Sequence, residues 1–325
     1  MDEQIFQPRT DLSALNNAVL SIRNEIKKII VGQDEMVKLI IAALLADGHV
    51  LIEGVPGVAK TLTAKLVAKS VQAGFSRIQF TPDLMPSDVL GTPVFNPREA
   101  SFEFKKGPIF SNIVLVDEIN RAPAKTQSAL LEIMEERQAT VDGKTYPMAQ
   151  PFMVLATQNP VEQEGTYRLP EAQLDRFMFK ILVPYPTEQE ELAILTQFNL
   201  MGNTRALDLI TPALDAQQIT TLKQQIKTQV IEEKLLQFIA KLIQHTRNHK
   251  SIYLGASPRA SLAIMNASKA IAAMQGRDFV TPEDILTIVP PVLRHRIILS
   301  PDKEMEGITE DEVIRQIIQG MDVPR

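Results

Sequence analysis

The sequence contains no cysteine, which excludes disulfide bonds, thiolate catalysis and cysteine-ligated metal sites. It also lacks an apolar run long enough to cross a bilayer: the longest, residues 39–46, falls far short of the ~20 residues that a transmembrane helix needs. Residues 1–11 have no apolar signal core. We therefore expect no membrane insertion and a cytoplasmic location.

A strong excess of one charge is absent as well. The chain has 34 Lys and Arg against 39 Asp and Glu, for a formal net charge of −5, and the charges are interspersed. This charge balance argues against a dedicated nucleic-acid binder, although a local basic strip could still exist on a chain with this net charge. The 325 residues, 45% of them hydrophobic, are enough for about two domains with a large core.

One stretch, residues 53–61 (EGVPGVAKT), has the pattern of a phosphate-binding loop. An apolar strand candidate precedes it and a helix candidate, residues 62–70, follows it, as such a loop requires. Backbone N–H groups of the loop would bind phosphate oxygens. Lys60 would reach the β- and γ-phosphates, and Thr61 would ligate Mg²⁺. The predicted nucleotide contacts here are Gly54, Val55, Pro56, Gly57, Val58, Ala59, Lys60, Thr61 and Leu62.

The loop departs from the pattern at Ala59, where the motif has glycine. We expect Ala59 to begin the helix, so that it needs no positive φ. The alternative interpretation of the stretch is a Gly/Pro turn between a strand and a helix.

Two further predicted strands end in polar residues, which we expect at the same edge of the sheet as the loop. Residues 113–116 are apolar and deliver Asp117, which would hold Mg²⁺, and Glu118, which would polarise the attacking water. Asn159 follows the strand predicted over residues 152–157 and could bind the water or the γ-phosphate. The alternatives are an exposed acidic turn and an ordinary Asn-Pro turn. Gln79 and Asn112 are polar residues that we expect beside this site.

The spacing of apolar residues predicts an α/β domain followed by helices alone. In the first part we expect helices over residues 12–30, 34–46, 62–70 and 124–136, strands over 49–52, 75–81, 113–116 and 152–157, a loop over 82–88, and hairpins over 94–104 and 138–146. In the second part we expect helices over residues 188–198, 215–230, 233–248, 258–274, 282–288 and 309–319. The predicted domains are residues 1–185 and 186–325.

Five separated motifs, in order, resemble those of the MoxR family of AAA+ ATPases. They lie at residues 54–61, 115–122, 156–160, 169–177 and 255–260, and the resemblance extends over roughly residues 12–300. It implies a P-loop NTPase fold, with a parallel sheet flanked by helices and then a small all-helical lid domain. It further implies a homo-oligomeric ring, usually a hexamer, with ATP at subunit interfaces.

The resemblance also implies roles for individual residues. Asn159 looks like the sensor-1 residue. Arg176 looks like the arginine finger given to the neighbour's ATP, with Arg168 a weaker rival. Arg259 looks like sensor 2, facing the γ-phosphate of its own subunit. Val31 and Gly32 resemble the segment that packs against adenine. From the residues alone, Arg176 could instead pair with Asp175 or Glu171, and residues 31–33 could be a helix breaker.

We expect an ATPase that uses Mg²⁺ and does chaperone-like work on a protein client, by resemblance often one with a von Willebrand factor A domain. A first alternative is a nucleic-acid motor or loader with the same core, using Lys105, Lys106 and Lys144 near the hairpins. A second is a scaffold that binds ATP and barely hydrolyses it. The basic residues 294–296 could touch nucleic acid or a neighbouring subunit, but a solvated basic face is the favoured interpretation.

Overall fold

The computed structural model describes residues 12–160, 166–201 and 206–324. At its centre lies a five-stranded sheet with the order β2-β5-β8-β1-β9, in which every pairing is parallel. The strands are β1 (Val50–Gly54), β2 (Phe75–Gln79), β5 (Ile113–Asp117), β8 (Met153–Gln158) and β9 (Phe179–Val183). Because all strands run the same way, their carboxyl ends share one edge, where ligands of open α/β sheets bind.

Both faces of the sheet are covered, which explains the unbroken apolar strand sequences. Val50 and Ile52 belong to the core on one face, while Leu51 between them belongs to the core on the other. The first face packs against α1 (Ser13–Lys27), α2 (Asp34–Leu45) and α3 (Lys60–Ser70). The second packs against α4 (Pro86–Leu90) and α5 (Ala124–Glu136). The short helix α4 occupies part of the segment predicted as a loop.

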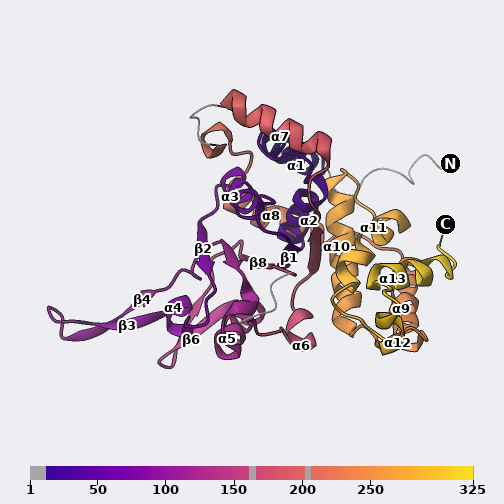
Figure 1. The fold of residues 1–325 in the computed structure, drawn as a ribbon. Coiled ribbons are helices and arrows are strands. Elements are labelled where there is room, and N and C mark those ends of the chain that lie inside the picture. Colours follow the sequence, from indigo (N-terminus) through magenta and orange to yellow (C-terminus); the bar gives the residue numbers. More distant parts are fainter. Residues whose placement is uncertain (1–11, 161–165, 202–205, 325) are drawn as a thin grey trace, which may run out of the picture.

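Two hairpins extend from the sheet, as the sequence predicts. They are formed by β3 (Gly91–Asn96) with β4 (Ser101–Lys106) and by β6 (Gln138–Val141) with β7 (Lys144–Pro147). Figure 1 shows the β3–β4 hairpin projecting well beyond the rest of the molecule. Phe104 in β4 stacks on Tyr146 in β7, with ring centroids 4.4 Å apart, so the hairpins contact each other at their bases.

Most of the later chain is helical, and Figure 1 shows its last helices gathered on one side of the molecule. Its helices are α6 (Glu171–Leu174), α7 (Glu188–Met201), α8 (Ala216–Lys227), α9 (Glu233–Asn248), α10 (Pro258–Met274), α11 (Pro282–Leu293), α12 (Pro301–Met305) and α13 (Glu310–Gln319). The expectation of helices alone is wrong in one detail, because β10 (Ile252–Leu254) and β11 (Ile298–Leu299) form an antiparallel pair. These strands are too short to show an alternating pattern. Helix α11 also continues through Pro290 and Pro291, past its predicted end.

The basic residues after α11 join the helical part to the sheet. His295 Nε2 lies 2.9 Å from the carbonyl oxygen of Phe177, and Arg296 Nε lies 2.7 Å from Asp175 Oδ1. His295 and Arg296 are only 7% and 8% exposed, so the prediction of a solvated basic face is wrong. A charge can be buried here because Asp175 neutralises it.

Within the described ranges, no helix has the length and apolar character needed to span a membrane.

Candidate functional site

The phosphate-binding loop connects β1 to α3, as predicted. Lys60 is the first residue of α3, and its Nζ donates a hydrogen bond to the carbonyl oxygen of Gly54, 2.5 Å away. Burial lowers the pKa of the Lys60 ammonium, while the carboxylates of Asp117 and Glu118 act against that shift. The cation and the two acids therefore act on one another at this edge of the sheet.

The prediction for the backbone of Ala59 is wrong. Ala59 is the N-cap of α3 with φ 59°, in the left-handed region, because the helix begins one residue later at Lys60. This conformation costs an L-residue roughly 1–2 kcal/mol relative to glycine. Gly57, earlier in the loop, also has a positive φ of 88°. The loop thus has a positive φ at two positions, and at one of them the residue is alanine, which has the smallest side chain.

Asp117 ends β5 and is held by two side chains that the sequence did not single out. Its Oδ2 accepts a hydrogen bond from Arg77 Nε at 2.6 Å, and its Oδ1 accepts one from Thr157 Oγ1 at 3.1 Å. The Thr157 hydroxyl also accepts a hydrogen bond from the Glu118 backbone N–H at 3.0 Å. Arg77 and Thr157 lie on the strands that flank β5, which the strand predictions alone could not reveal.

Glu118 follows with a left-handed backbone, φ 57°, that turns the chain sharply at the end of the strand. Its carboxylate accepts a hydrogen bond from Gln79 Nε2 at 2.9 Å and pairs with Arg121 at 3.0 Å. The expectation that Gln79 lies beside the site is therefore confirmed. The same expectation for Asn112 is wrong: Asn112 bonds to the Gly74 N–H at the amino end of the parallel strands, the opposite edge.

Asn159 follows β8, which lies between β1 and β5. Its side chain is buried, with 7% exposure. Three adjacent strands thus deliver an ammonium with a hydroxyl, two carboxylates and an amide to one edge. Carboxylate and hydroxyl oxygens suit a hard cation such as Mg²⁺, and an ammonium beside backbone N–H groups suits phosphate.

A cavity of about 300 Å³ adjoins the loop and is walled mostly by apolar groups. Its lining residues are Ile29, Ile30, Val31, Gln33, Gly57, Val58, Ala59, Leu62, Pro186, Ile194, Gln197, Phe198 and Ala206. Val31 is one of them, and Gly32 is not. Gly32 has φ 75°, and a Cβ there would clash with the Glu190 carboxylate. Sequence analysis missed Ile194 and Phe198, whose i, i+4 spacing on α7 was the available signal.

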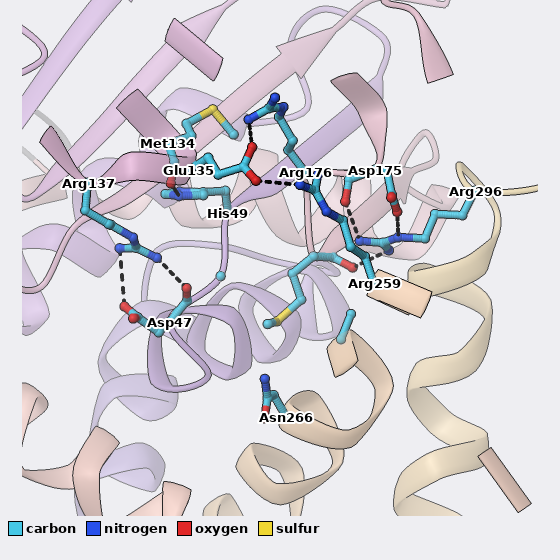
Figure 2. Close-up of a pocket in the computed structure, with 13 residues that line it drawn as sticks. Asp47, His49, Met134, Glu135, Arg137, Asp175, Arg176, Arg259, Asn266 and Arg296 are labelled. Carbon is cyan, nitrogen blue, oxygen red and sulfur yellow. Dashed lines mark hydrogen bonds and ion pairs between the residues drawn. The ribbon is translucent and has the colours of Figure 1, made fainter. Parts of the chain in front are cut away.

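Arg176 and Arg259 lie together in another cavity, of about 250 Å³ (Figure 2). Both guanidinium groups pair with the carboxylate of Glu135, and Arg259 Nη2 lies 2.5 Å from its Oε1. Neither Lys60 nor Glu118 lines this cavity. In this structure α10 holds Arg259 beside Arg176, and Arg259 does not line the cavity next to the phosphate-binding loop.

The acid that pairs with Arg176 is also not one of those considered from the sequence. Asp175 instead pairs with Arg296 and accepts a hydrogen bond from Ser257 Oγ at 2.7 Å. Ser257 is the N-cap of α10, two residues before Arg259. Asp175 therefore binds the helical part, and Arg176 faces the cavity.

His49 lies at the wall of this cavity but has a structural role. It directly precedes β1, with Nε2 3.0 Å from the Met134 carbonyl oxygen and Nδ1 2.9 Å from the Val154 nitrogen. Burial lowers the pKa of His49 to about 3, so the ring is neutral at physiological pH. A neutral ring accepts the Val154 N–H at one nitrogen and donates from the other.

Comparison with known proteins agrees with this geometry. Residues 49–179 match the family model described as "ATPase family associated with various cellular activities (AAA)", and residues 244–317 match an AAA lid domain. The chain is 47% identical to the Bacillus subtilis "Uncharacterized protein YeaC" over 299 residues, 92% of each chain. It is 44% identical to "Chaperone MoxR1" of Mycobacterium tuberculosis over 93% of this chain and 81% of that one.

A crystal structure of a putative ATPase from Cytophaga hutchinsonii superimposes with a TM-score of 0.86 at 42% identity, covering 97% of this chain and 99% of that one. With close relatives that match nearly its whole length, a parallel sheet carrying the phosphate-binding loop, and a matching lid domain, this chain belongs to the MoxR family of AAA+ ATPases.

Proposed function

We propose that this ATPase binds Mg-ATP at the carboxyl edge of its sheet and hydrolyses it at sites shared between neighbouring subunits of a ring, usually a hexamer in this family. The observation that carries the proposal is the separation of the charged groups. Lys60, Asp117 and Glu118 share the sheet edge, whereas Arg176 and Arg259 lie in a different cavity. Arginines placed apart from the phosphate loop of their own subunit are suited to the nucleotide of a neighbour.

The residues of the edge would divide the work by charge. Thr61 and Asp117 would hold Mg²⁺, which neutralises phosphate oxygens when bound. Lys60 would bind the β- and γ-phosphates through its ammonium. Glu118 would accept a hydrogen bond from the attacking water and orient it, and Asn159 would bind that water or the γ-phosphate. Gln79 holds the Glu118 carboxylate and so limits its orientations.

The apolar cavity beside the loop would take the adenine base. Its size suits a flat ring, and its walls come from the segment before α2, from the loop and from α7. Burying an aromatic base against such walls stabilises binding by roughly 25 cal/mol per Å² of apolar area. Val31, Val58 and Leu62 would therefore contribute mainly to the affinity for ATP rather than to the chemical step.

We also propose that hydrolysis drives chaperone-like remodelling of a protein client, including the class with von Willebrand factor A domains. The relative named "Chaperone MoxR1" supports a protein client. The burial of His295 and Arg296 makes residues 294–296 unsuited to contact nucleic acid, and the nucleic-acid alternative then rests on Lys105, Lys106 and Lys144 near the hairpins. Lys106 near the hairpins also lies over the Phe110 ring, 5.2 Å from its centroid.

ATPase rate measured against protein concentration tests the shared site. We expect specific activity to rise with concentration, and Arg176→Ala subunits mixed into wild type to lower the rate by more than their share. Glu118→Gln protein provides the background. A concentration-independent rate that falls only in proportion to the mutant fraction would show that each subunit is self-sufficient and would overturn the proposal.

A further inference from the structure

Glu135 connects the two arginines that the proposed function assigns to the neighbour's nucleotide. It lies near the carboxyl end of α5, whereas Arg176 follows α6 and Arg259 lies in the first turn of α10. One carboxylate oxygen pairs with Nη1 of Arg176 and the other with Nη2 of Arg259. Figure 2 shows the carboxylate between the two guanidinium groups. A single acid therefore joins cations that come from the sheet and from the helical part.

The two cations need such an acid because they repel each other. Burial and the positive charge of Arg259 both lower the pKa of Arg176, and Glu132 acts in the opposite direction. Among the ion pairs of the described residues, Glu135 is the acid that pairs with both arginines, whereas Asp175 is already paired with Arg296. Glu135 thus provides the charge that allows Arg176 and Arg259 to lie side by side.

The pairing leaves both arginines able to bind a further anion. Each guanidinium has five N–H donors, and Glu135 uses one terminal nitrogen of each arginine. Arg176 gives one more hydrogen bond, to the Leu131 carbonyl oxygen at 3.2 Å. The side chains of Arg176 and Arg259 are 29% and 49% exposed, so phosphate oxygens can approach the remaining donors.

We propose that Glu135 is a positioning residue, which holds Arg176 and Arg259 as one unit for the phosphates bound to the neighbouring subunit. This proposal rests on the proposed function, in which these arginines act in trans. Without the carboxylate, the two guanidinium groups separate by mutual repulsion and no longer reach the same phosphates. The chemical step therefore slows, while the affinity for ATP, which the Lys60 loop and the apolar cavity set, stays unchanged.

A subunit-mixing experiment tests this. Glu118→Gln subunits keep both arginines, and Arg176→Ala subunits keep the Lys60 loop and Glu118. A mixture therefore regains activity at each interface where a Glu118→Gln subunit supplies its arginines to the nucleotide of an Arg176→Ala subunit. Glu135→Gln is then added to one kind of subunit at a time. Glu136→Gln, on the same helix, is the matched control, because Glu136 has no ion pair with either arginine among the contacts of the described residues.

We expect Glu135→Gln in the Glu118→Gln subunits to lower the regained kcat at least about tenfold and to leave KM for ATP unchanged. A tenfold loss is part of the roughly 10³–10⁵-fold increase in kcat that an arginine finger supplies. The same change in the Arg176→Ala subunits should have little effect, because their arginine pair is already disabled. Equal loss from both kinds of subunit would indicate a general structural role and overturn the proposal, and so would no loss from either. If the starting mixture regains no activity, the shared site itself is refuted.

Discussion

Replacing Asp175 with asparagine should destabilise the protein strongly, because Asp175 is the acidic partner of a buried arginine. Arg296 Nε lies 2.7 Å from Asp175 Oδ1, and the arginine side chain is 3% exposed. Removing one partner of a buried ion pair costs about 3–5 kcal/mol, since the other charge stays buried. Arg296 also donates to the backbone carbonyl oxygens of Phe177, Met178 and Val292, which the substitution leaves in place. We therefore expect the lower end of the range, about 3 kcal/mol.

The neighbouring ion pair offers a matched control. Arg294 Nη2 lies 2.9 Å from Asp311 Oδ2, and this pair is more exposed than Arg296 and Asp175, with side-chain exposures of 14% and 30%. Asp311→Asn should therefore cost only about 1 kcal/mol or less. Urea unfolding followed by circular dichroism measures both, because the chain has no tryptophan to report by fluorescence. If Asp175→Asn costs no more than Asp311→Asn, the buried pair does not hold the helical part to the sheet.

Three further predictions follow from the site and the core. Ile194→Glu places a charge in the apolar cavity and should raise KM for ATP about tenfold or more. Leu195→Glu, on the exposed side of α7, should leave KM unchanged. Equal effects of the two substitutions in steady-state kinetics would refute the assignment of the cavity to adenine. Glu118→Gln should abolish turnover while nucleotide binding, measured by calorimetry, persists; a wild-type rate no higher than this variant would favour the scaffold alternative. Burial lowers the pKa of His49 from 6.5 to about 3 and also lowers the pKa of His295, so the unfolded chain binds extra protons at both rings. Stability is complete above pH 6.5, and His49 alone should lower it by about 2 kcal/mol when the pH is lowered to 5, with His295 adding to the loss. A flat profile in urea titrations would contradict this.

The edge of the sheet could be predicted because each functional residue lies at the end of an apolar strand or in the short segment that follows it. Lys60, Asp117 and Asn159 come after the first strands of the chain that are buried on both faces, and parallel strands bring their carboxyl ends together. The unbroken apolar runs, the loop motif and the order of the motifs were enough. No knowledge of which strands are neighbours was required to place these groups at one edge.

The features that the sequence could not reveal depend on contacts between distant segments. Arg259 and Glu135 are 124 positions apart, and nothing local to Arg259 indicates that α10 holds it beside α5. The three basic residues 294–296 have the composition of a solvated face, and only a partner 121 positions away makes burial of Arg296 affordable. For Ala59, the predicted start of the helix is wrong by a single residue, because α3 begins at Lys60. That one position decides the sign of φ at Ala59, and helix boundaries predicted from sequence vary by one or two residues.

Asp175 and Arg176 show how the two parts of the chain depend on each other. They are adjacent on one backbone, yet Asp175 binds Ser257 and Arg296 of the helical part, and Arg176 faces the cavity with Glu135. A displacement of the helical part that pulls on Asp175 must therefore move the backbone of Arg176 as well. Because arginine placement within about 1 Å decides its effect on a transferring phosphoryl group, Asp175→Asn should lower kcat even in protein that remains folded. Activity measured in the absence of denaturant, where a loss of about 3 kcal/mol leaves most molecules native, separates this effect from unfolding.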